Sequence, residues 1–333
     1  MLDVIDAFPS QCAEAIKLGE AFAYEPSEGI QQVVVCGMGG SAMAGDIAHR
    51  FARVPLFVNR GYDIPSFVGP HTLLVAVSYS GNTAETLSSF EQGIAAGAQV
   101  LAISSDGRLK EAAGAHGIPF LEIPRGYQPR AAMGYLALPL LVVLERLKLL
   151  VDLGRFEALL DRLEQVKAQC TPSVATSDNP AKSLAQTLDG RIPVVYGTVG
   201  NTDLVAMRTK TQINENAKQA AFWNVFPELN HNEILALVRA DLFANPYVLL
   251  LQNGTDRREL LARMEIMMGL MKEHGVPFQV LVAQGETELA QVFSQIYFGD
   301  YLSAYLAVLG GIDPTPVQLI EGFKKALAQR LSD

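Results

Sequence analysis

The sequence predicts an α/β protein with two lobes, each a parallel β-sheet flanked by helices. Short apolar runs alternate with helical segments along the chain, which is typical of parallel sheets. A strand, a glycine-containing turn and a helix follow one another near residues 33–51 and again from residue 193. This repeat in architecture indicates two similar units. With 333 residues, 49% of them apolar and 18% charged, the chain is long enough for both.

The first lobe is expected to follow a helical lead-in over residues 1–30. Its strands are expected at 33–36, 55–58, 73–77, 99–103 and 120–123. The run at 73–77, LLVAV, is uninterrupted and apolar, as in a parallel strand buried on both faces. Helices are expected after the first strand, through residue 51, and over 86–96.

Residues 151–185 are expected to form helices and a polar linker, with the boundary at 171–180. Strands are then expected at 193–196, 247–251 and 276–282, with a helix through residue 271. We therefore expect an N-terminal domain over 1–150, a linker over 151–185 and a C-terminal domain over 186–333. The second copy lacks the serines of the first, which predicts two lobes but one phosphate site.

The loop SYSGNTAET, residues 78–86, is the strongest local signal for a binding site. It joins the central apolar strand to a helix and carries the hydroxyls of Ser78, Ser80 and Thr83, with Gly81 allowing a tight turn. Backbone N–H groups and the positive end of a helix meet in such a loop, so a phosphate monoester suits it. The alternative, a Ser/Thr-rich N-cap with nothing bound, stays open on this loop alone.

Two other loops lie at predicted strand ends. GMGGSAMAGD, residues 37–46, lacks the third glycine of a dinucleotide fingerprint, and no acid closes the second strand, so no nucleotide cofactor is expected. Arg130 follows the strand at 120–123 and precedes a strongly apolar helix. It is either a surface charge or a side chain facing the ligand crevice at the carboxyl ends of the strands.

Charge and cysteine content exclude several classes of protein. The formal net charge is −9 without a long basic run, which argues against a nucleic-acid partner. Cys12, Cys36 and Cys170 are odd in number and lack C-x-x-C spacing, which argues for a reducing compartment and against zinc or disulfides. Residues 1–15 lack a basic leader, and the most apolar segment, 131–144, is too short to span a bilayer. We expect a cytoplasmic protein without a membrane partner.

Five motifs occur in one order: GMGGSAMAGD, SYSGNTAET, YQPRAA, NENAK and FPELNHNEI. Together they resemble the bifunctional phosphoglucose/phosphomannose isomerase family, whose members are built from two sugar-isomerase (SIS) domains. The likeness covers residues 33–327. Ala44 stands where a glycine is usual and Ala84 where a glutamate is common, and neither is a site position in that family.

The resemblance implies interconversion of glucose 6-phosphate, fructose 6-phosphate and mannose 6-phosphate through a cis-enediol, without metal or cofactor. Glu215 matches the family's base, which carries a proton between C1 and C2 of the sugar. His231, sixteen residues further on, matches the ring-opening histidine. Arg130 matches the arginine that stabilises the enediolate. The positions that match the sugar- and phosphate-binding residues are Gly39, Gly40, Ser41, Ser78, Ser80 and Thr83.

The family also uses one lysine of the C-terminal helix for ring opening, and the sequence offers Lys324 and Lys325. An apolar stripe over Ile320, Phe323 and Leu327 defines the expected buried face. At about 100° per residue, Lys324 lies close to that face and Lys325 lies far from it. We therefore expect Lys324 to point inward and to be the ring-opening lysine.

The resemblance further implies a homodimer in which His231 completes the site of the neighbouring subunit. In the family, a threonine seven residues before the ring-opening lysine leaves room for both C2 epimers, where glucose-only isomerases carry glutamine. Here that position is Val317, with Thr315 and Gln318 close by, and the preferred epimer stays open. The alternative function is a phosphosugar-binding sensor without catalysis, which has no need of Glu215 or His231.

Overall fold

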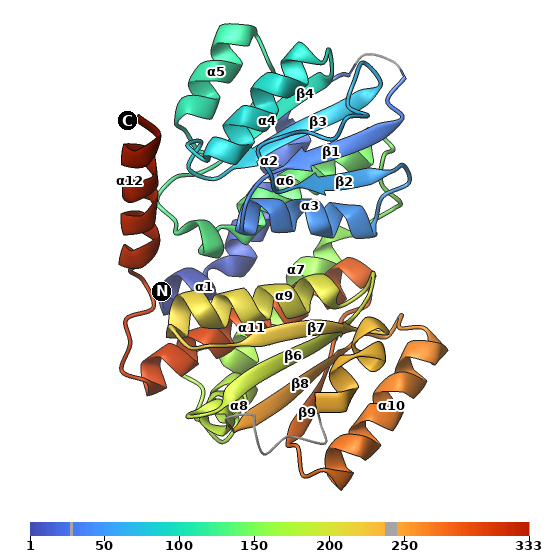
Figure 1. Ribbon diagram of the computed structural model, residues 1–333, viewed down its shortest axis with the longest axis vertical. Coiled ribbons are helices and arrows are strands. Elements are labelled where there is room, and N and C mark those ends of the chain that lie inside the picture. The colour runs from blue at the N-terminus through green and yellow to red at the C-terminus, as the bar shows by residue number, and fades with distance from the viewer. Residues whose placement is uncertain (27–28, 237–244, 333) are drawn as a thin grey trace.

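The computed structural model describes residues 1–26, 29–236 and 245–332. It contains two parallel sheets, one in each half of the molecule, and both are flanked by helices (Figure 1). The predicted α/β class with two lobes is confirmed. Most predicted strands lie within one or two residues of the observed ones, because each is a short apolar run bounded by turn residues.

The N-terminal sheet has the strand order β2-β1-β3-β4-β5, and every neighbouring pair is parallel. The central strand, β3, is buried along its whole length, as its unbroken apolar sequence predicts. Helices α2, α3 and α6 pack on one face of this sheet, and α4 and α5 pack on the other (Figure 1). The strands are β1 (Gln32–Cys36), β2 (Leu56–Asn59), β3 (Thr72–Ser78), β4 (Gln99–Ser104) and β5 (Phe120–Glu122). The helices are α1 (Leu2–Asp6), α2 (Phe8–Ala21), α3 (Gly40–Arg50), α4 (Ala84–Ala95), α5 (Arg108–His116) and α6 (Met133–Arg146).

The C-terminal sheet has the order β7-β6-β8-β9, which repeats the order of the first four N-terminal strands. The last strand begins later than the predicted 276, because Gly275 is left-handed and Pro277 lacks an amide donor. Strand β7 was not expected from the sequence. The strands are β6 (Ile192–Thr198), β7 (Phe222–Phe226), β8 (Pro246–Gln252) and β9 (Phe278–Val282). The helices are α7 (Phe156–Cys170), α8 (Pro180–Leu188), α9 (Asp203–Gln212), α10 (Arg258–Glu273) and α11 (Glu288–Leu309).

One apolar core runs through both lobes. It joins Val35 of β1 and Leu136 of α6 to Leu249 of β8 and Phe293 of α11. Helices α7 and α8 pack against α11, so the segment between the two sheets is largely a structural layer. The lobes are therefore held together by buried apolar surface, which stabilises their relative placement. The division of the chain at residues 150 and 186 stays a prediction.

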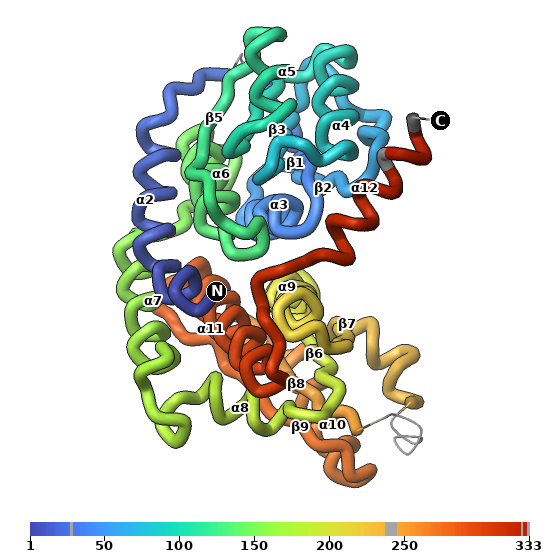
Figure 2. The backbone as a smooth tube through the Cα atoms, turned by 90° about the vertical axis from the view of Figure 1, so that its left-hand side faces the viewer, coloured from blue at the N-terminus to red at the C-terminus, as the bar shows by residue number. Residues whose placement is uncertain are grey.

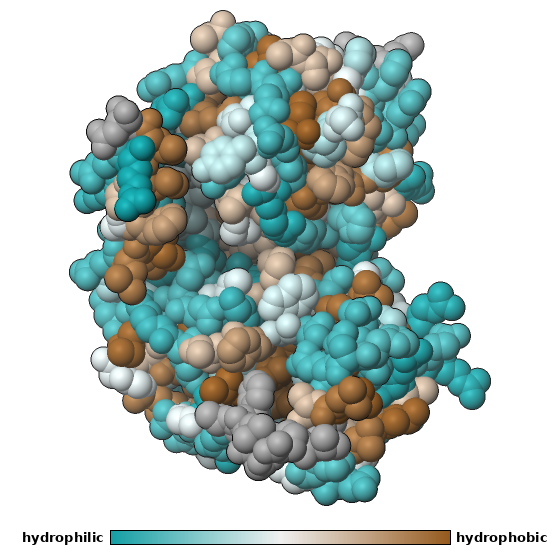
Figure 3. All heavy atoms as spheres, viewed as in Figure 1, coloured by the Kyte–Doolittle hydropathy of each residue, from teal (hydrophilic) through white to brown (hydrophobic). Residues whose placement is uncertain are grey.

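The last helix, α12 (Gln318–Ser332), lies alongside the N-terminal lobe after the chain has left the C-terminal lobe (Figures 1 and 2). Its apolar side chains are at the surface (Figure 3), with Leu319 91% and Phe323 70% exposed. Within the described ranges, none of the helices has the length and apolarity needed to cross a membrane.

Candidate functional site

The glycine turn after β1 opens helix α3. Gly39, with φ +53°, is the N-cap of that helix, a backbone conformation that glycine adopts without strain. Gly40 lies so close to the Pro129 carbonyl that an added Cβ would be 3.3 Å from it. Ser41 is buried, and its Oγ accepts a hydrogen bond of 3.3 Å from the Tyr79 amide. The glycine turn therefore contacts the next strand end and the segment that carries Arg130.

The serine loop lies between β3 and α4, as predicted, although the helix begins at Ala84 instead of residue 86. Ser78 is buried and donates to Thr83 Oγ1 at 3.0 Å, while Ser80 is exposed and accepts from the Asn82 amide at 3.3 Å. Gly81 has φ +67°, and a Cβ there would lie 1.7 Å from the Asp106 carbonyl oxygen. Hydroxyls and a helix N-terminus thus meet at one place, and only glycine fits the turn between them.

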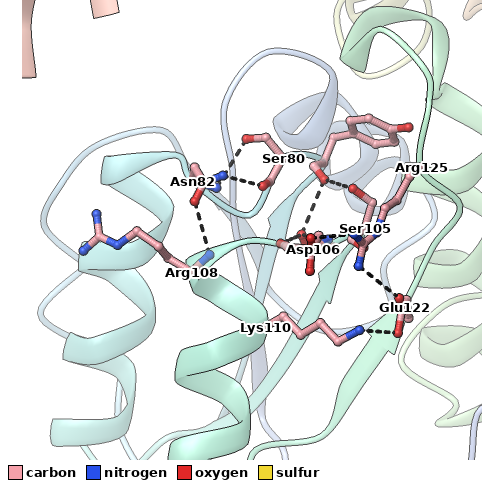
Figure 4. A network of polar contacts seen from close by, with 10 residues as sticks. Ser80, Asn82, Ser105, Asp106, Arg108, Lys110, Glu122 and Arg125 are labelled. Atoms are coloured by element: carbon pink, nitrogen blue, oxygen red, sulfur yellow. Dashed lines mark hydrogen bonds and ion pairs between the residues drawn. The ribbon is translucent and has the colours of Figure 1, made fainter. Parts of the chain in front are cut away.

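Polar contacts hold the serine loop from outside (Figure 4). The Asn82 carboxamide accepts from the Arg108 amide at 3.2 Å and donates to the Ser80 carbonyl at 2.9 Å. Asp106 pairs with Arg125 at 2.7 Å, and Arg125 Nε donates to the Ser105 carbonyl at 3.1 Å. These contacts fix the loop backbone before any ligand binds, which lowers the entropic cost of binding.

Arg130 is buried, with 5% of its surface exposed, so the surface-charge alternative is wrong. It belongs to a single 3-10 turn, Pro129–Ala131, before α6. Its Nε donates to Asn216 Oδ1 at 2.7 Å, and its Nη2 donates to the carbonyls of Pro314 and Thr315 at 2.5 and 3.0 Å. Burial lowers the pKa of Arg130, while the nearby Glu215 carboxylate opposes this effect.

Glu215 comes from the other lobe. It lies in a π-helical segment, Ile213–Ala217, which continues α9. Its Oε2 is 3.7 Å from Arg130 Nη1, and one third of its side chain is exposed. The next residue, Asn216, is buried and donates to Ser303 Oγ of α11 at 2.9 Å. The structure therefore brings the predicted base and the predicted arginine together from segments that are distant in the sequence.

A buried ion pair supports Arg130 from below. Arg208 donates to the Arg130 carbonyl at 3.0 Å and to both carboxylate oxygens of Asp300 at 2.8 and 2.9 Å. Gln212 donates to the same carboxylate at 2.6 Å. Burial raises the pKa of Asp300, and Arg208 and Gln212 act against that rise. Nothing in the sequence pattern pointed to this pair, since both residues lie inside helices.

His231 is exposed and lies away from this group. It ends a short 3-10 helix, Glu228–His231, that follows the carboxyl end of β7. The segment after Glu215 lies instead near the amino end of β6, because Gln219 donates to the Arg191 carbonyl at 2.6 Å. At about 3.3 Å per residue, β6 separates the two sheet edges by about 20 Å. Within one chain, the structure does not bring His231 to Glu215.

Lys324 and Lys325 are both exposed on α12, so the expectation that Lys324 points inward is wrong for the single chain. The apolar stripe used for that expectation is itself uncovered, with Ile320 43% exposed. The segment before α12 does reach the site, because Thr315 accepts from Arg130. Val317 is half-buried and immediately precedes α12, and Gln318, the first residue of that helix, is exposed.

In the C-terminal lobe, the loop after β8 corresponds to the serine loop after β3, and a side chain of the protein occupies it. Asp256, after β8, accepts hydrogen bonds of 2.6 Å from Thr198 Oγ1, Asn201 Nδ2 and the Asn253 amide. A carboxylate therefore takes the donors that a bound anion would use in the N-terminal lobe. This contact gives a physical reason for the prediction of one phosphate site in two lobes.

Comparison with known proteins agrees with the motifs. Residues 177–327 match the family model of the bacterial phospho-glucose isomerase C-terminal SIS domain. The bifunctional phosphoglucose/phosphomannose isomerase of Caldicellulosiruptor bescii is 38% identical over 99% of both chains. The protein of the same name from Thermoplasma acidophilum is 39% identical over 89% of both. The chain belongs to this family.

The family's two-lobed fold also occurs in more distant solved structures. A hypothetical protein from Thermus thermophilus superposes with a TM-score of 0.76, covering all of this chain and 90% of the other. The two sequences are 16% identical, so this likeness concerns the fold alone. In this chain, the glycine turn, the serine loop and Arg130 lie on the N-terminal lobe, and Glu215 comes from the C-terminal lobe.

Proposed function

We propose that this chain is an aldose–ketose isomerase that interconverts glucose 6-phosphate, fructose 6-phosphate and mannose 6-phosphate. The observation that carries the proposal is the Glu215 carboxylate, 3.7 Å from the buried Arg130 guanidinium. The relatives named above carry both isomerase activities in their names. The sequence similarity to these relatives covers nearly the whole chain, which supports the proposal.

In this proposal, the hydroxyls and amides of the serine loop bind the phosphate, and Glu215 carries a proton between C1 and C2 of the open-chain sugar. The negative charge that develops on the oxygens of the cis-enediolate is stabilised by Arg130. Since Arg130 is already buried and hydrogen-bonded, its charge is preorganised and needs little rearrangement during the reaction. Gly39, Gly40 and Ser41 lie on the same side and are assigned to the sugar.

A phosphosugar sensor is the rival function. A sensor would need the glycine turn and the serine loop, but not an arginine that a second lobe buries beside a carboxylate. Burying a charged guanidinium there costs desolvation free energy. A protein that only binds the sugar phosphate gains nothing in return for this cost. This cost favours the enzyme.

The test is a coupled assay for isomerisation of fructose 6-phosphate by the parent chain and by Glu215→Gln. The amide keeps the shape of the side chain but cannot accept the proton, so turnover should fall by roughly 10²–10⁴-fold. Binding of glucose 6-phosphate, measured by calorimetry, should be retained. A parent chain that binds but does not turn over would establish the sensor, and an active Glu215→Gln chain would remove Glu215 from the base role.

The mannose activity depends on room beside C2, since glucose and mannose 6-phosphates pass through the same enediol. Val317 matches threonine in shape and lacks the hydroxyl. We expect turnover of mannose 6-phosphate at a lower kcat/KM than that of glucose 6-phosphate. A mannose value lower by roughly a thousandfold, about 4 kcal/mol in the barrier, would leave a glucose-only enzyme.

We also propose a cytoplasmic homodimer in which His231 and one α12 lysine serve ring opening. Lys324 is preferred to Lys325 because it lies nearer to the apolar stripe that a second copy could cover. Supporting this, His231 is exposed at the sheet edge opposite to Glu215, and α12 exposes apolar side chains that a second copy could cover. Mixing inactive His231→Ala chains with inactive Glu215→Gln chains should restore part of the activity, because one site per mixed dimer receives both residues. A fully active monomer in ultracentrifugation would contradict the shared site.

A further inference from the structure

Lys218 lies next to the proposed base and has no role in the function described so far. It ends the π-helical segment of Glu215 in a left-handed conformation, with φ +53°. A non-glycine residue adopts this conformation at a cost, so it needs compensating contacts. Its Nζ provides one by donating to the Glu215 carbonyl at 2.8 Å. The lysine thereby closes the turn that carries the base.

The same Nζ also reaches the C-terminal arm, residues 312–317. It donates to the Pro314 carbonyl at 3.2 Å, and this oxygen also accepts from Arg130 Nη2 at 2.5 Å. Within the arm, Asp313 Oδ1 accepts from the Thr315 amide at 2.8 Å, which shapes the turn. Two cations therefore converge on one main-chain oxygen beside Glu215.

This contact is where the arm is held to the site. The chain leaves α11 through Gly310 and Gly311, which has φ +64°, and α12 follows the arm at once. Within a single chain, most apolar side chains of α12 are exposed, so buried apolar surface contributes little to its placement there. Hydrogen bonds from charged donors, such as those of Arg130 and Lys218, are stronger than hydrogen bonds between neutral groups. Arg130 and Lys218 therefore hold the arm from which α12 continues.

We propose that Lys218 is a positioning residue, which holds the turn of Glu215 and the start of the C-terminal arm in one arrangement. It thereby sets where the α12 lysine that opens the sugar ring lies relative to the base. This inference rests on the proposed function. Two of the three N–H groups of the Lys218 ammonium donate to carbonyl oxygens, which suits a residue that holds the main chain in place. Burial and the neighbouring Arg130 lower its pKa, while Asp313 and Glu215 oppose the shift.

The test measures ring opening separately from proton transfer. In a Glu215→Gln chain the isomerisation is blocked, while catalysed exchange between the α and β anomers of glucose 6-phosphate still reports ring opening by two-dimensional exchange NMR. Adding Lys218→Met removes the charge and the donor but keeps the apolar stem. We expect the catalysed anomer exchange to fall by roughly 10–100-fold, the loss that a small misplacement causes. Lys218→Arg, which can still donate to both carbonyls, should retain most of the exchange.

Lys272→Met is the matched control, since Lys272 is exposed in the last turn of α10 and its loss changes the net charge equally. Lys272→Met should leave the rate of anomer exchange and the rate of isomerisation unchanged. Should Lys218→Met fold poorly, Lys218→Gln keeps a neutral donor and should lie between lysine and methionine. Anomer exchange within twofold of the parent in the folded variants would overturn the inference. A parent chain that does not isomerise fructose 6-phosphate would instead overturn the proposed function.

Discussion

The buried pair of Arg208 and Asp300 offers the sharpest test of how the site is supported. The two side chains are 4% and 7% exposed, and their closest atoms are 2.8 Å apart. Asp300→Asn keeps the volume but leaves the Arg208 guanidinium charged, buried and without its carboxylate. Removing one partner of a buried ion pair typically costs about 3–5 kcal/mol in free energy of unfolding, and we expect a loss of this size here.

The reasoning separates the cost of an unpaired charge from the value of the pair. Replacing both partners, as Arg208→Met with Asp300→Leu, removes the uncompensated charge along with the attraction. The double variant should therefore lose less than the sum of the single losses, by up to about 3 kcal/mol. Its remaining loss reflects Gln212 and the Arg130 carbonyl, which lose their partners.

The assay is urea unfolding followed by circular dichroism, with midpoints and slopes compared across the parent, both single variants and the double variant. Isomerase turnover measured on the same folded samples should also fall, since Arg208 anchors the main chain of Arg130. A loss of less than about 1 kcal/mol for Asp300→Asn would refute the view that the pair is buried and charged.

Two further outcomes are expected. Gly81→Ala should raise the KM for hexose phosphates and lower stability, because the new Cβ would lie 1.7 Å from the Asp106 carbonyl oxygen. Gly117→Ala is the control, since Gly117 has a similar φ and open space around it. Equal effects of the two substitutions in KM measurements and thermal melts would contradict the argument. Burial raises the pKa of Cys36 to about 12 and that of Cys170 to about 11, so these thiols stay protonated at pH 8. Ellman's reagent should therefore not react with the native chain but should detect three thiols in urea. A rapid reaction of Cys36 or Cys170 in the native chain would contradict their burial.

Much of the architecture could be predicted from the sequence because it depends on local patterns. An apolar run of five residues, LLVAV, can be satisfied only as a buried strand or helix segment, and the glycine and hydroxyl residues after it select a strand followed by a tight loop. The serine loop and its place before α4 follow from these neighbours alone. The family motifs then connect that loop with Glu215, His231 and Arg130 as expectations.

What only the tertiary structure decided is which of these residues meet. Arg130 and Glu215 approach each other because two lobes pack on one continuous core, and no local pattern encodes that packing. Helix periodicity described α12 as an amphipathic helix correctly, but it could not say what covers the apolar face, so Lys324 was misplaced. Lys218 closes the motif NENAK, but the motif gave no sign of its contact with the distant Pro314 carbonyl, which depends on how the C-terminal arm folds back. A sequence determines short-range geometry through steric and hydrogen-bonding preferences, whereas contacts between distant segments depend on the burial of the whole chain.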